Sequence, residues 1–157
     1  MNFILDNKID IISSTPKEFD HSVGYHDIKP FNIKNDGHLL IHRYPQNTIG
    51  SKKNLSIDLC LWDHKKGFFE KIDESTAWSW EQGSRLQWLD ENRIIYNKEI
   101  DNKFVSCVYN KNNMEKLIFS NPIYSIKKDK FLTLNYSRLW NQWKNYGYFS
   151  NSITQNN

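Results

Sequence analysis

The sequence predicts an all-β fold, an incomplete β-propeller of about two and a half four-stranded antiparallel blades. Two observations point to strands: short apolar runs alternate with turn signals, and few segments show helical periodicity. The third observation is that one order of hairpins recurs every 40–50 residues or so, which is typical of propeller blades. A β-sandwich or meander with coincidental internal similarity is the alternative interpretation.

The first copy of the repeat spans about residues 25–73. Its expected strands are the strand-like runs 29–33, 38–42, 56–62 and 68–72. The first two runs flank Asn35-Asp36-Gly37, which favours a tight hairpin turn because glycine tolerates positive φ. A second turn, in residues 63–67, then leads into the last run of this copy.

A second copy follows at about residues 85–119, and part of a third at about 122–148. The second copy contains the runs 85–89, 93–96, 104–109 and 115–119, and the third begins with 123–126 and 131–134. When the copies are aligned, Cys60 falls on Cys107 and Trp62 falls on Tyr109. The chain is thus divided into an N-terminal segment, 1–20, a partial propeller, 21–148, and a tail, 149–157.

This number of blades cannot close a ring, because propellers typically have four to eight blades. An open end exposes blade-packing faces and unpaired strand edges, which favour association with another chain. We therefore expect either a truncated product of a longer gene or a fragment that self-associates through the open edge.

Composition excludes several classes of protein. Aromatic residues make up 15% of the 157 residues, which indicates a folded domain and not a disordered chain. The net charge is only +3 and its signs are interspersed, so nucleic acid is not an expected partner. Without a secretory signal or an apolar run long enough to span a bilayer, we expect no membrane partner and a cytoplasmic location. In that compartment Cys60 and Cys107 are expected to be buried free thiols.

Most Trp and several Arg and His residues fall in loops that share one face of a propeller. The candidate ligand-binding residues are Tyr25, Arg43, Trp78, Trp80, Gln82, Arg85 and Arg138. Aromatic rings stack on sugar rings and arginine forks bind carboxylates, so the predicted ligand is an acidic or neutral glycan. The alternative is structural: Trp78 and Trp80 fill the gap between blades, and Arg85 pairs with Glu81.

His21 and His26 are candidate ligands for a divalent metal, since they lie five residues apart and Asp27 follows directly. No third strong metal ligand lies at a matching position in the sequence. We find no phosphate-binding loop, dinucleotide fingerprint or nucleophile motif, and no pair of carboxylates marked out for acid–base work. The sequence therefore predicts no other cofactor and no catalytic residues.

Parts of the chain resemble known propellers. The segment GYHDIKPFN (24–32), followed by Asn35-Asp36-Gly37, resembles a first blade of TolB-like and oligogalacturonide-lyase-like propellers. The segment TAWSWEQGSRLQW (76–88), together with 137–139 and 146–148, is similar to an uncharacterised group of bacterial propellers associated with polysaccharide biosynthesis, some labelled as glycosyltransferases. The resemblance covers roughly residues 20–148.

The resemblance implies a role in surface-polysaccharide metabolism. Lyase-type relatives use histidines and a divalent metal, with an arginine near the substrate carboxylate, but only His21 or His26 matches here by loop position. Three functions stay open. They are a non-catalytic module, or the remnant of one, that binds a glycan or a partner; a fragment of a metal-assisted polysaccharide lyase or hydrolase; and a protein-interaction scaffold.

Overall fold

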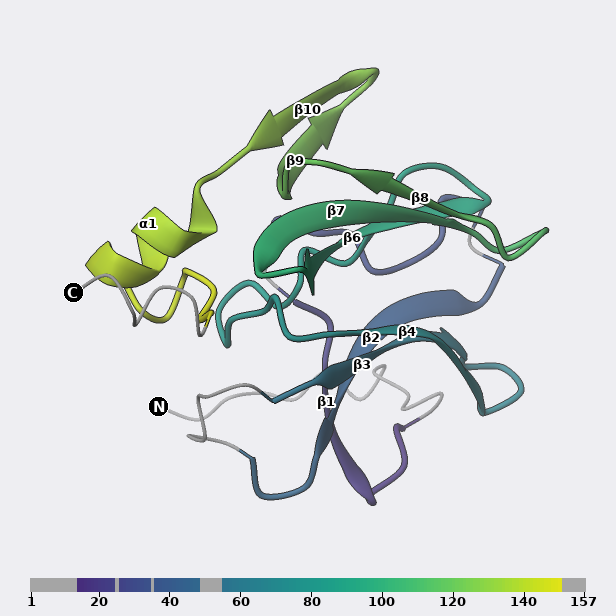
Figure 1. The fold of residues 1–157 in the computed structure, drawn as a ribbon. Helices are drawn as coiled ribbons and strands as arrows, with labels where there is room; N and C mark the ends of the chain where they lie inside the picture. The colour runs from purple at the N-terminus through teal and green to yellow at the C-terminus, as the bar shows by residue number, and fades with distance from the viewer. Residues whose placement is uncertain (1–13, 25, 35, 49–54, 151–157) are drawn as a thin grey trace, which may run out of the picture.

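The structure, a computed structural model, describes residues 14–24, 26–34, 36–48 and 55–150 (Figure 1). Within these residues the chain forms ten strands and one short helix, and the strands make three antiparallel sheets. The predicted all-β class is therefore confirmed. No helix in the described part is both long and apolar enough to span a membrane.

The first sheet is a four-stranded meander. Its strands, in spatial as well as chain order, are β1 (Phe19–Ser22), β2 (His38–Pro45), β3 (Ile57–Asp63) and β4 (Phe68–Ser75). The turn after β3 is held by the Asp63 carboxylate, which accepts the backbone N–H groups of Lys65 and Lys66, both at 3.1 Å. Gly67 closes this turn at φ +67°, a conformation that favours glycine.

The second sheet repeats the same order. Its strands are β5 (Gln87–Trp88), β6 (Arg93–Ile100), β7 (Lys103–Asn110) and β8 (Lys116–Phe119). A two-stranded hairpin follows, made of β9 (Ile123–Lys127) and β10 (Lys130–Thr133). The chain then enters the helix α1 (Tyr136–Gln142), where the Asn135 side chain caps the start by accepting the Arg138 N–H at 2.9 Å.

The two four-stranded sheets have matching strand registers. In the first sheet Cys60 pairs with Ile41 on one side and Lys71 on the other. In the second sheet Cys107 occupies the same place, between Tyr96 and Ile118. The aligned Trp62 and Tyr109 are likewise equivalent, since they pair with Leu39 and Ile94 of the corresponding strands. Both cysteines are buried and free, as predicted.

The first strand of the first sheet differs from the prediction. We placed it at residues 29–33, but that segment makes only a short bridge to β2, between Phe31 and Leu39. Pro30 lacks a backbone N–H, which limits how far pairing can extend there. The position is taken by β1, which pairs with the second half of β2 from Phe19 opposite Pro45 onward.

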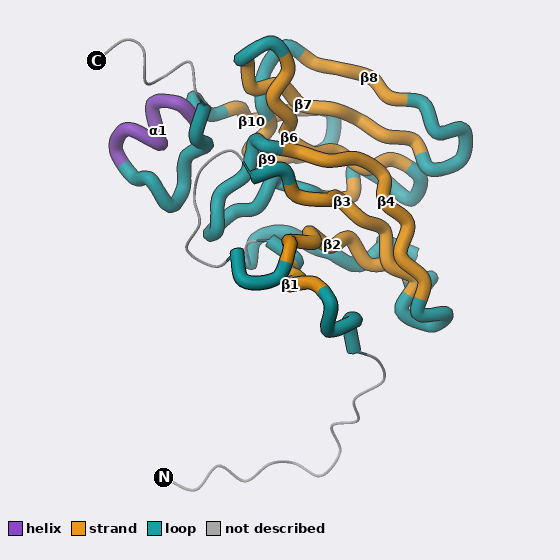
Figure 2. Tube along the Cα trace, turned by 60° about the horizontal axis from the view of Figure 1, so that its bottom comes forward, coloured by secondary structure: helices purple, strands orange, loops and turns teal. Residues whose placement is uncertain are grey.

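The two sheets and the hairpin stack in chain order (Figures 1 and 2). The largest apolar cluster lies between the two sheets and includes Leu40, Leu59, Leu61 and Ile72 from the first sheet and Ile94, Tyr96, Cys107 and Tyr109 from the second. The opposite face of the second sheet packs Ile95 and Val108 against Ile123 of the hairpin. Strands β6 and β7 are therefore covered on both faces, whereas β8 is exposed.

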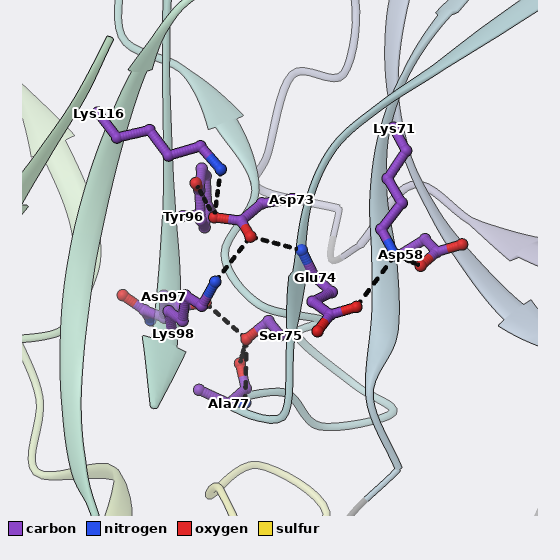
Figure 3. Close-up of polar contacts among 10 residues, drawn as sticks. All are labelled: Asp58, Lys71, Asp73, Glu74, Ser75, Ala77, Tyr96, Asn97, Lys98 and Lys116. Carbon is purple, nitrogen blue, oxygen red and sulfur yellow. Dashed lines mark hydrogen bonds and ion pairs between the residues drawn. The ribbon is translucent and has the colours of Figure 1, made fainter. Parts of the chain in front are cut away.

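Polar contacts also join the two sheets (Figure 3). The Asp73 carboxylate on β4 accepts a hydrogen bond from the Tyr96 hydroxyl at 2.5 Å. It also pairs with the ammonium groups of Lys98 at 2.7 Å and Lys116 at 3.1 Å. Nearby, the Ser75 hydroxyl donates to the backbone carbonyl of Asn97 at 2.8 Å. These contacts fix the edge of the first sheet against strands β6 and β8.

Candidate functional site

A hollow of about 760 Å³ opens beside α1. Its wall combines the loop between β4 and β5 with the end of the hairpin, the helix and the residues after the helix. The lining residues are Gln82, Tyr124, Leu134, Leu139, Trp143, Lys144, Asn145 and Tyr146. The hollow is thus built from three separate stretches of the chain, and its shape depends on where α1 is docked.

A pair of stacked tyrosines docks the helix. The rings of Tyr136 on α1 and Tyr148 lie 3.9 Å apart at an angle of 2°, and both residues are buried. The Tyr136 hydroxyl donates to the Ile123 carbonyl, and the Asn97 amide donates to the Tyr148 hydroxyl, both at 2.9 Å. The helix is therefore tied to β6 and to the hairpin.

The chain after the helix folds back tightly on it. At Gly147 an added Cβ would lie 2.0 Å from the backbone nitrogen of Trp140, so only glycine fits there. The Trp143 N–H donates to the Leu139 carbonyl at 2.7 Å and closes the end of α1. This close return places Lys144, Asn145 and Tyr146 against the hollow.

Gln82 supplies a buried polar group to the hollow. The residue is only 4% exposed, and its side-chain Oε1 has no hydrogen-bond partner among the described residues. A tight turn holds it: the Gln82 N–H donates to the Ser79 hydroxyl at 3.3 Å, and Gly83 follows at φ +57°. A buried carbonyl without a donor costs about 1–3 kcal/mol. Because Oε1 exposes less than 1 Å² of surface, a ligand in the hollow can pair with it only if the Gln82 side chain turns.

The rim of the hollow is aromatic and cationic. Trp143 is 68% exposed, an unusual state for so large an apolar ring, and Lys144 is exposed beside it. A second hollow of about 550 Å³ shares Leu134, Leu139 and Trp143 with the first and is also lined by Arg138. Exposed aromatic surface with a few convergent polar groups is typical of small-ligand sites.

Two of the seven predicted ligand-binding residues lie at these hollows, namely Gln82 at the first and Arg138 at the second. Tyr25 lies outside the described residues. Arg43 is paired within the first sheet, where it donates to Asp58 at 2.6 and 3.0 Å and covers the Phe19 ring. It lines neither hollow.

Trp78 is buried and Trp80 half-buried, and neither lines these two hollows. Both border a smaller hollow of about 20 Å³, which Lys144 and Asn145 also line. Each ring lies 5.2 Å from that of Tyr44, and the Trp78 indole donates to the Leu55 carbonyl at 2.7 Å. Both belong to, or pack against, the cluster between the two sheets. This placement matches the structural interpretation, in which they fill space between neighbouring repeats.

Arg85 is also an interior residue, at 1% exposure. Its guanidinium donates to both carboxylate oxygens of Asp27, at 3.0 and 2.9 Å, and lies over the Tyr124 ring. The expected partner Glu81 was wrong, because Arg85 turns inward at φ +56° towards a residue far away in the sequence. Burial alone would lower the pKa of Arg85, but the hydrogen bonds and charge of Asp27 raise it.

The two candidate metal ligands lie in different settings. The His21 ring on β1 packs 5.4 Å from Phe69, whereas His26 is exposed in a turn. Burial and the nearby Arg43 charge lower the pKa of His21, which favours its neutral form. In the part of the chain that the structure describes, no three His, Cys, Asp or Glu side chains are grouped to hold a metal ion. The metal site therefore stays a prediction.

Sequence reasoning missed most of the first hollow. Leu139 and Trp143 are absent from the predicted site because α1 is not predicted, whereas Tyr124 and Leu134 fall in runs that are predicted only as strands. One signal was available: Leu139 and Trp143 are four residues apart, which is the spacing of one helical face. No family model, curated protein or solved structure matches the chain.

Proposed function

We propose that this protein is a non-catalytic carbohydrate-binding module whose site is the hollow beside α1. One observation carries the proposal: the exposed Trp143 ring and the exposed Lys144 stand at one hollow, which is also lined by Gln82. A sugar has the matching chemistry, since its C–H face packs on an aromatic ring and its hydroxyls donate hydrogen bonds.

The charges around Trp143 favour an acidic sugar. Lys144 lines the first hollow and Arg138 the second, and no Asp or Glu among the described residues lines either one. Both cations can pair with a carboxylate, and the arginine can do so through two hydrogen bonds. A place in surface-polysaccharide metabolism, as the resemblance to bacterial propellers implies, is consistent with such a ligand.

We also propose that the two meanders and the hairpin are successive blades of an incomplete propeller. Equivalent registers around Cys60 and Cys107 support this arrangement, as does the stacking of the three units in chain order. The hairpin corresponds to the first two strands of a blade, and α1 follows where a third strand would begin.

Trp143→Ala is expected to weaken binding of an acidic oligosaccharide about tenfold or more, because the ligand loses both buried apolar area and ring stacking. Isothermal titration or a glycan array would measure the change. Phe68→Ala is the matched control, since Phe68 is also an exposed aromatic residue but lies on β4 and lines neither hollow.

A second variant tests the interior of the site. Gln82→Leu removes the unpartnered acceptor while keeping a similar volume, and should also lower the affinity. If both variants bind as tightly as the wild type and remain folded, the hollow is not the glycan site. If neutral and acidic oligosaccharides bind equally well, the assigned role of Lys144 and Arg138 is wrong.

A further inference from the structure

The outer edge of strand β10 is an exposed, apolar strand edge. All four of its residues are exposed, with Phe131 at 41% and Leu132 at 56%. Within the described residues β10 pairs with β9 alone, whereas β9 is mostly covered. Unpaired edges of this kind are ready templates for another strand.

The hairpin is also short of strands by comparison with its neighbours. The other two sheets have four strands each, and this one has two. A two-stranded unit is marginally stable in water, and further strands or a packing partner are needed to stabilise it. The hairpin gains packing on one face from the second sheet, but β10 itself contributes little to that contact.

We propose that β10 pairs antiparallel with β10 of a second copy of this chain, about a two-fold axis perpendicular to the sheet. The result is one four-stranded sheet in the order β9-β10-β10-β9, which has the same number of strands as the other two sheets. Such an interface is self-complementary and closed, so it yields a dimer and no open fibre. This proposal does not depend on the glycan-binding function.

The sequence of β10 suits this pairing. An axis at Phe131 sets that residue opposite the partner's Phe131, and sets Lys130 opposite the partner's Leu132, so no lysine faces another lysine. Phe131 already contacts Phe119 of the second sheet, with ring centroids 6.0 Å apart. The dimer therefore gathers two such aromatic pairs on one face, and cross-strand aromatic pairs stabilise sheets.

The charges next to β10 make the association dependent on salt. The turn between β9 and β10 is Lys128-Asp129, and Lys127 and Lys130 flank it, so this exposed segment has three positive charges and one negative charge. Antiparallel pairing brings each turn towards the start of the partner's α1, which carries Arg138. Like charges at both ends oppose dimerisation, and added salt screens them. The dimer should therefore be tighter at high ionic strength.

Sedimentation velocity of the full chain, over a wide range of concentration and at two salt concentrations, tests this proposal. We expect a monomer–dimer equilibrium that shifts to dimer with salt. Phe131→Lys should weaken it about tenfold or more, because the two-fold axis sets the new lysine against its own copy. Ile118→Lys is the matched control, since β8 is also an exposed apolar strand at the edge of its sheet, but that sheet already has four strands.

Hydrogen exchange supplies a second readout on the wild-type chain. Amides of β10 should become more protected as protein concentration rises, whereas those of β8 should not. A wild type that is monomeric at every concentration overturns the proposal. So does a dimer that persists in a folded Phe131→Lys variant, or one that Ile118→Lys weakens equally.

Discussion

Asp27→Ala is expected to lower the free energy of unfolding by about 1.5–3 kcal/mol, because Arg85 loses its charged hydrogen bonds. The cost is below that of a fully buried pair, since Asp27 is 37% exposed and water can reach its side of the guanidinium. Arg85 is almost completely buried, and Asp27 is its only carboxylate partner among the described residues. Without Asp27 the guanidinium keeps only the Tyr124 carbonyl, at 2.8 Å, and the ring beneath it. Urea denaturation at neutral pH measures the loss.

A double variant separates this charge effect from lost packing. Asp27→Ala combined with Arg85→Met removes both charges while keeping most of the side-chain volume, so it should be more stable than Asp27→Ala alone. Glu74→Ala is the surface control, because the Lys71–Glu74 pair is half-exposed and its loss should cost less than about 1 kcal/mol. If the double variant is the less stable of the two, the buried charge does not dominate at this position.

The repeat was predictable because its signals are local. Alternating apolar residues and turn residues define β3 and β7 within a few positions, and the alignment of Cys60 with Cys107 follows from them. Strand β1 was not predictable in this way. It has four residues without a clear alternation of apolar and polar side chains, and its pairing is decided by the distant strand β2.

The prediction failed at helix α1 for a different reason. Asn135 is a good N-cap residue, and Leu139 and Trp143 have helical spacing, but Arg138 and its neighbours are predicted as a loop of the third repeat. The helix is stabilised by Tyr148, which stacks on Tyr136 from beyond the end of the helix. Such a contact cannot be inferred from periodicity.

The site was only partly predictable for the same reason. Gln82 and Arg138 were selected for their chemistry and do lie at the hollows. Arg85 was selected on the same grounds, but its position depends on Asp27, 58 residues earlier in the chain. Residue type thus indicates what a side chain can bind, whereas long-range packing decides whether it faces solvent or the interior.

The second large effect concerns acid, and it depends on Asp73 between the two sheets. This carboxylate is 8% exposed, and burial alone would raise its pKa. Hydrogen bonds from Lys98, Tyr96, the Glu74 N–H and Lys116 outweigh burial and lower the pKa of Asp73 from 3.8 to about 2 (Figure 3). The folded state therefore binds a proton at Asp73 less readily than the unfolded chain does.

Because the pKa is lower in the folded state, the stabilising contribution is complete above the unfolded value and is lost as pH falls. A shift of this size corresponds to about 2 kcal/mol, which should disappear between about pH 4 and pH 2. Asp73→Asn is expected to lose a similar amount at neutral pH and to show a flatter dependence of stability on pH in the acid range. Urea denaturation at a series of pH values measures both effects.

Asp58 provides the matched control on the neighbouring strand. Burial would raise the pKa of Asp58, but hydrogen bonds from Lys71 and Arg43 lower it, and its side chain is 25% exposed. Its contacts lie within the first sheet, so Asp58→Asn should change the acid dependence less than Asp73→Asn does. If the two variants lose acid dependence equally, the contact between the sheets stabilises the protein no more than the Asp58 contacts within the first sheet do. If Asp73→Asn keeps the wild-type slope below pH 4 or so, the carboxylate is not charged and paired as the geometry requires.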